Sequence, residues 1–144
     1  MSKIKVDNLS VIFGKRLKEA QEFQEQGKSK VEILTQTGCT VGVSNANLEI
    51  EEGEVFVVMG LSGSGKSTLL RCFNRLIDPT SGTVEVDGND ITKINEHALR
   101  EFRRTKMTMV FQHFGLLPHR TVSSNVAFGL EIQGVDEDTR IQKA

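Results

Sequence analysis

The chain has 144 residues and a formal net charge of −1, and 38% of its residues are hydrophobic. That length allows one domain with its own core, and the near-neutral charge gives no basic footprint, so we expect no nucleic-acid partner. The longest apolar runs have about five residues against the ~20 that cross a bilayer, and the first residues show no signal-peptide pattern. With two cysteines in no metal or redox motif, we expect a globular cytosolic protein.

The first third of the chain predicts two strands separated by helices. Apolar and polar residues alternate over residues 4–13, which indicates a strand pair or one bent strand. Residues 15–40 change to helical spacing and high charge. Ser29 and Glu32 form a capping-box pattern, and Gly38 is a natural helix C-cap. We therefore predict a helical insertion at 15–40 between two strands.

The next segment predicts strand, turn and helix in succession. Residues 41–50 again alternate as a strand. Residues 55–59 are continuously apolar, which is typical of a buried parallel strand. Helical spacing of apolar residues follows over residues 68–77. Cys72 falls on this helix, and we expect it to be a packing residue.

Between that strand and that helix lies a glycine-rich run of the form G-x-x-x-x-G-K-[ST]. Its glycines let the backbone turn tightly and expose N–H groups that hold phosphate oxygens. Lys66 would reach the β- and γ-phosphates of a nucleotide, and Ser67 would offer its hydroxyl to Mg²⁺. The predicted phosphate-binding residues are Gly60, Leu61, Ser62, Gly63, Ser64, Gly65, Lys66, Ser67 and Thr68.

The remaining residues alternate between short strands and capped helices. Gln112 stands at the end of an apolar strand pattern, and His113 and His119 fall in the loop that follows, where we expect both to be exposed. The predicted elements are a turn at 78–82, a strand at 83–88, a helix capped by Asn95 to about 103, a strand at 106–111, a helix capped by Thr121 to about 130, and the start of another helix at 135–138.

Taken in this order, the phosphate loop, the turn after it, the short strand and Gln112 resemble the ATP-binding subunit of ABC transporters, over residues 51–134. The resemblance implies an α/β fold of the phosphate-loop NTPase type, with an N-terminal antiparallel β part and the start of a helical subdomain. It divides the chain into the insertion at 15–40, a core at 51–112 that ends at the Q-loop, and the beginning of the helical subdomain at 113–144.

The resemblance also implies roles for single residues. Gln112 is similar to the Q-loop glutamine, a supporting catalytic residue that helps to hold Mg²⁺ and the attacking water. Phe13 lies where the family places an aromatic ring that stacks on adenine, although a core phenylalanine on the first strand remains an alternative. ATP and Mg²⁺ are the implied ligands, with Ser67 and Gln112 at the metal.

The insertion and the phosphate loop resemble in particular the ATPase subunits of quaternary-amine importers, which take up glycine betaine, proline or carnitine. The implied partners are a membrane subunit, contacted through the loop after Gln112, and a second ATPase subunit in a head-to-tail homodimer. An extracytoplasmic solute-binding protein takes part indirectly. The implied location is the cytoplasmic face of the cell membrane, as a peripheral protein.

The 144 residues contain no LSGGQ signature, and no apolar strand ending in Asp-Glu follows Gln112. We therefore expect an incomplete domain that is marginally stable, presents an apolar sheet edge, and binds Mg-ATP weakly without hydrolysing it alone. One alternative remains open: a naturally short, non-catalytic decoy that pairs with a full-length subunit. Another phosphate-loop enzyme, such as a small-molecule kinase, is disfavoured by the Val110-Phe111-Gln112 element and the loop after it.

Overall fold

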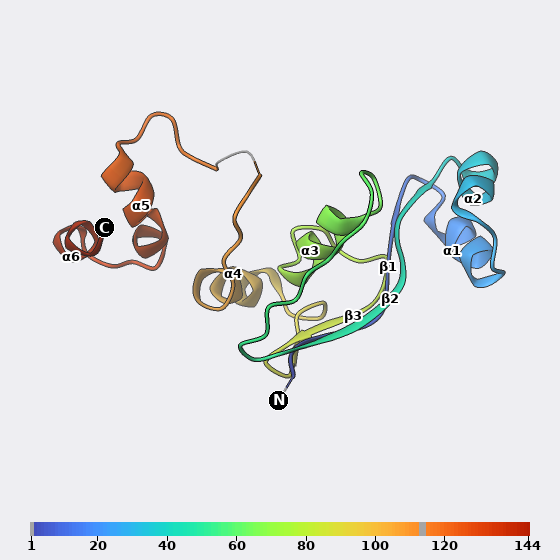
Figure 1. The fold of residues 1–144 in the computed structure, drawn as a ribbon, viewed down its shortest axis with the longest axis horizontal. Coiled ribbons are helices and arrows are strands. Elements are labelled where there is room, and N and C mark those ends of the chain that lie inside the picture. The colour runs from blue at the N-terminus through green and yellow to red at the C-terminus, as the bar shows by residue number, and fades with distance from the viewer. Residues whose placement is uncertain (1, 113–114) are drawn as a thin grey trace. The chain divides into compact units, whose positions relative to one another are not determined.

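The computed structural model describes residues 2–112 and 115–144. The chain forms two compact units, Met1–Ile94 and Asn95–Ala144, each with its own packing (Figure 1). His113 lies outside the described residues, and the side chain of His119 is exposed as predicted.

The first unit is built on an antiparallel sheet of four strands in the order β2-β1-β3-β4. The strands are β1 (Ser2–Phe13), β2 (Thr40–Glu51), β3 (Ser81–Val86) and β4 (Asn89–Asp90). β1 is central and pairs with β2 on one side and β3 on the other. Of the two alternatives for residues 4–13, a strand pair or one bent strand, the structure shows a single strand, and register shifts interrupt both of its ladders.

The core of this sheet lies mainly along β1 and β3. Val6, Leu9 and Val84 are almost fully buried, as is Ile91 just after β4. In β3, where successive residues point to opposite faces, Val84 and Val86 are buried and Glu85 between them is partly exposed. β1 departs from this alternation, because all four residues from Leu9 to Ile12 are buried.

The predicted helical insertion is confirmed as α1 (Leu17–Glu25) and α2 (Lys30–Thr37), which lie at one end of β1 and β2 (Figure 1). The Ser29 side chain and Glu32 form both bonds of the capping box, and Gly38 ends α2 in the left-handed conformation, with φ of +70°. The insertion is fastened to the strands by a small buried cluster. Its members are Ile12, Ala20, Ile33, Cys39 and Val41, with Phe23 packed against them.

Two predicted strands are absent. Residues 55–59 and 106–111 form no strand, and Val55, Val57 and Val110 are 88%, 67% and 93% exposed. Neither segment pairs with a strand among the described residues, and an extended backbone needs a neighbouring strand for its hydrogen bonds. An apolar sequence by itself was therefore not enough to make a strand.

The helix after the phosphate loop is α3 (Lys66–Phe73), which contacts β2 and β3. It ends four residues before the predicted position, because Arg75 adopts a φ of +54° that no α-helix continues. Cys72 is fully buried on this helix, so its prediction as a packing residue is confirmed.

The second unit contains α4 (Glu96–Thr105), α5 (Val122–Ile132) and α6 (Glu137–Lys143). As predicted, Asn95 and Thr121 cap their helices: each side chain accepts a hydrogen bond from the backbone N–H three residues later. None of the helices in the described ranges is both long and apolar enough to pass through a bilayer.

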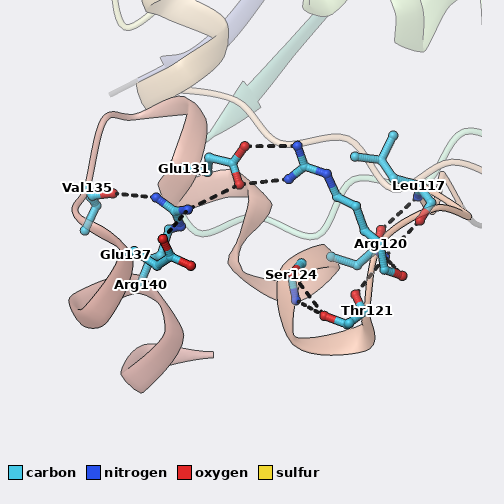
Figure 2. A network of polar contacts seen from close by, with 9 residues as sticks. Leu117, Arg120, Thr121, Ser124, Glu131, Val135, Glu137 and Arg140 are labelled. Atoms are coloured by element: carbon cyan, nitrogen blue, oxygen red, sulfur yellow. Dashed lines mark hydrogen bonds and ion pairs between the residues drawn. The ribbon is translucent and has the colours of Figure 1, made fainter.

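A charged network joins the loop before α5 to the end of that helix (Figure 2). The Arg120 guanidinium donates to both carboxylate oxygens of Glu131, over 2.8 and 3.0 Å, in a bidentate pair. Arg140 approaches the same carboxylate at 3.8 Å. The hydrogen bond from Arg120 is the main reason why the pKa of Glu131 lies below its usual value.

Candidate phosphate-binding site

The glycine-rich loop runs from the extended segment 55–59 into α3. Gly60, Gly63 and Gly65 have φ values of +156°, +78° and +97°, which residues with a side chain rarely adopt. The structure therefore confirms the backbone geometry that the sequence predicts for a phosphate-binding loop.

The position of Gly65 requires a glycine for a second reason, namely its close approach to β2. A Cβ atom at this position would overlap the carbonyl oxygen of Gly42. Gly42 is the extra residue of a β-bulge, because Val11 pairs with Val43 while Ile12 pairs with Val41. The loop thus contacts the bulge at Gly42, a residue that was not predicted from the sequence. An isolated glycine inside a strand pattern is the signal that could have found it.

The N-terminus of α3 opens toward the loop without a side-chain cap. Its N-cap residue is Gly65, which has no side chain that could cap the helix. By contrast, α2 and α4 each begin with a residue whose side chain caps the helix. The first N–H groups of α3 are therefore left for an external acceptor, and the helix dipole favours an anion there.

Lys66 is the first residue of α3, and its side chain turns back over the loop. The ammonium group donates to the carbonyl oxygens of Gly60 and Leu61, both at 2.8 Å, and lies 3.5 Å from the Ser64 hydroxyl. An ammonium group has three donors and carries its charge at one point. Such a group can also bind phosphate oxygens.

A cavity of about 420 Å³ adjoins this lysine. One wall comes from the loop and α3, a second from the segment before the loop, and a third from β2 and α2. The lining residues are Lys30, Gly42, Val43, Ser44, Val58, Met59, Ser64, Gly65, Lys66 and Leu69.

Phe13 lies close to this region, at the end of β1. Its side chain is 45% exposed, whereas that of the preceding Ile12 is 4% exposed. A Cβ atom on Gly42 would meet the Phe13 ring at 2.8 Å and the Thr68 methyl group at 3.4 Å. Phe13 and the start of α3 thus approach the same glycine.

The predicted metal ligands are Ser67 and Gln112. Ser67 is exposed in the first turn of α3, and its hydroxyl is a hard oxygen donor of the kind that Mg²⁺ prefers. Gln112 belongs to the second unit, where its side chain is exposed. In the described ranges, no group of three or more His, Cys, Asp or Glu residues could hold a metal.

These features define a nucleotide-binding site of the phosphate-loop class. The family model described as ABC transporter matches residues 43–144, and the chain belongs to this family. The fold prediction of an ABC-type ATPase is thereby confirmed.

Relatives resemble the chain along its whole length. It is 56% identical over 144 residues to the glycine betaine/carnitine transport ATP-binding protein GbuA of Listeria monocytogenes. It is 56% identical to the glycine betaine transport ATP-binding protein OpuAA of Bacillus subtilis, and 54% identical to ProV of Escherichia coli, of the glycine betaine/proline betaine transport system. The matches cover 99–100% of the chain, which spans only 34–36% of these relatives.

A solved structure supports the same assignment. The ATP-binding cassette MJ0796, in a dimeric post-hydrolysis state bound to ADP and Pi, superimposes with a TM-score of 0.75 at 29% identity. The match covers 96% of the chain and 53% of that cassette.

Proposed function

We propose that the protein is the ATP-binding, energy-coupling subunit of an ABC importer for glycine betaine or a related quaternary-amine solute. The observation that carries the proposal is the phosphate loop with Lys66 over it. The solute class rests on identities of 54–56% to ATP-binding proteins of glycine betaine transport.

In this proposal the loop binds the triphosphate of ATP. The N–H groups at the start of α3 and the Lys66 ammonium hold phosphate oxygens, and the exposed face of Phe13 stacks on adenine. Mg²⁺, when bound, neutralises developing charge on the phosphates. Ser67 would hold this ion together with Gln112, whose amide also orients the attacking water.

The partners proposed are those of an importer. The loop after Gln112 contacts a membrane subunit, and a second ATPase subunit completes the catalytic site in a head-to-tail dimer. A solute-binding protein acts on the other side of the membrane. The protein itself would be peripheral, on the cytoplasmic face.

We further propose that residues 1–144 alone bind Mg-ATP without turning it over. Hydrolysis needs a positioned water, a carboxylate and a second clamp on the phosphates, and these residues contain no LSGGQ signature to provide that clamp. An ATPase rate above that of Lys66→Ala, in material free of contaminating ATPases, would contradict this point.

Uptake of radiolabelled glycine betaine tests the function as a whole. The gene is deleted in its own organism and replaced by the wild-type gene, by Lys66→Ala, or by Lys18→Ala as a matched control, since Lys18 is exposed on α1. We expect the deletion to reduce uptake, and the wild type and the control to restore it. Lys66→Ala should restore none.

Undiminished uptake in the deletion strain, with other importers of the solute removed, would contradict the proposed solute. Full restoration by Lys66→Ala would contradict the role of the phosphate loop.

A further inference from the structure

We propose that the helical insertion supplies a second cation to the nucleotide pocket: Lys30, which binds the polyphosphate of the nucleotide across from Lys66. The inference rests on the proposed function, since it assumes that this cavity receives a nucleotide. If Lys30 binds the polyphosphate, the insertion between β1 and β2 takes part in nucleotide binding.

The first observation is the position of Lys30. It lines the same cavity of about 420 Å³ as Ser64, Gly65 and Lys66, yet it comes from α2. Two lysines from separate elements thus face one cavity, while no acidic residue is among its lining residues. A cavity with this charge pattern favours an anion.

The second observation is that the Lys30 ammonium group, unlike those of Lys66 and Lys28, has no partner among the described residues. Lys66 is bound to two backbone carbonyls, and Lys28 donates to Gln36 and lies over the Phe23 ring. The Lys30 side chain makes no hydrogen bond or ion pair with the residues that the structure describes. It is also the first residue of α2, where the positive end of the helix dipole disfavours a cation. Helix stability therefore does not explain this lysine.

The third observation is that α2 is fixed relative to the cavity wall. Ile33 of α2 is 1% exposed and packs in one cluster with Ile12 of β1 and Val41 of β2. Gln24 of α1 donates to the Ser44 hydroxyl at 2.8 Å, and Ser44 lines the cavity. The insertion is thus held to the strand that forms one wall, which keeps the Lys30 backbone near the phosphate loop.

The polyphosphate is the part of a nucleotide that this arrangement fits. Gly65 and Lys66, which line the cavity with Lys30, lie at the N-terminus of α3 where an anion is favoured. Adenine carries no charge for an ammonium group to neutralise. Lys30 is exposed, so the contribution should be moderate and should weaken with added salt.

The test is a fluorescence titration of Mg-ATP, Mg-ADP and AMP against protein purified at the length that its own cells produce. The variants are Lys30→Gln, Lys30→Arg, and Lys18→Gln as the matched control, which removes the same charge from the same insertion outside the cavity lining. Lys66→Ala serves as the reference for loss of the phosphate loop. Melting temperatures establish that each variant is folded.

We expect Lys30→Gln to weaken Mg-ATP binding roughly three- to fivefold at low salt, the effect of losing one partly exposed charge contact. The affinity for AMP should change less, Lys30→Arg should restore Mg-ATP binding, and Lys18→Gln should bind like the wild type. Inorganic tripolyphosphate should compete with Mg-ATP less well in Lys30→Gln than in the wild type. That result would show that Lys30 contacts the polyphosphate and not the nucleoside.

The inference is overturned if folded Lys30→Gln binds Mg-ATP as the wild type does, or if Lys18→Gln loses as much affinity. An equal loss for AMP and ATP would overturn the polyphosphate assignment. These outcomes differ from failure of the proposed function, in which the wild type and Lys66→Ala would be equally poor binders.

Discussion

β1 and the segment 55–59 are both strand-like in sequence, yet they behave in opposite ways. β1 pairs with a strand on each side and buries Val6 and Leu9. Residues 55–59 pair with no described strand, and Val55 is 88% exposed although this segment is the more apolar of the two.

Pairing partners, and not hydrophobicity, therefore decide which of these two segments becomes a strand. The backbone N–H and C=O groups of a strand form hydrogen bonds with neighbouring strands. Whether a segment becomes a strand therefore depends on residues far away in sequence. The phosphate loop beside it forms without a ladder, since its shape is encoded in its own glycines.

The largest effect should come from a buried residue of β1. Leu9 is fully buried, so Leu9→Ala should lower the free energy of unfolding by about 2–5 kcal/mol through lost burial and a cavity. Val57→Ala, in the exposed segment, should change it by less than about 0.5 kcal/mol. Urea denaturation measures both.

The same two variants test whether β1 and residues 55–59 really differ in burial. If Val57→Ala were as harmful as Leu9→Ala, residues 55–59 would be buried in the folded protein, and the contrast with β1 would be wrong.

The next largest loss of stability should come from the contact between the phosphate loop and β2. Gly65→Ala should reduce the free energy of unfolding by about 1–3 kcal/mol, because the residue has a φ of +97° and its new Cβ would overlap the Gly42 carbonyl oxygen. Gly27→Ala is the matched control, with a φ of +76° and nothing within 4 Å of the added atom. Equal losses would show that the contact with β2 has no role.

A smaller effect should come from the insertion that joins β1 to β2. Ser29→Ala removes the cap of α2 and should reduce the free energy of unfolding by about 1 kcal/mol. Glu32→Gln keeps a side chain that can complete the capping box and should change little. Thermal unfolding followed by circular dichroism compares them, and an unaffected Ser29→Ala would contradict a stabilising role for the cap.

The smallest effect is a pH dependence in the second unit. Because Arg120 lowers the pKa of Glu131 below its ordinary 4.5, the charged carboxylate stabilises the fold above that pH. The stabilisation is lost as the pH falls through the lowered pKa. Wild type should therefore exceed Glu131→Gln in stability at neutral pH, and the difference should shrink below about pH 4.5. A difference that stayed constant down to pH 3 would contradict this ion pair.

Features encoded within a few residues were predictable from the sequence. Ser29 with Glu32, Asn95 and Thr121 cap their helices as predicted, and the glycines of the loop adopt the expected backbone. Each depends on hydrogen bonds or steric limits between near neighbours.

Features that depend on distant contacts were not predictable. The strand predictions for 55–59 and 106–111 were wrong because no described strand pairs with either. Gly42 and Lys30 were missed because their importance appears only when β2 and α2 lie next to the loop. Gln112 stays a prediction.

Calorimetric titration of Mg-ATP into the wild-type protein and into Lys66→Ala measures whether this loop binds a nucleotide through its phosphates. The account predicts saturable binding by the wild type, weakened at least about tenfold in Lys66→Ala, since a hydrogen bond from a charged group contributes roughly 1.5–3 kcal/mol. Equal binding by both folded proteins, or none by the wild type, would contradict it.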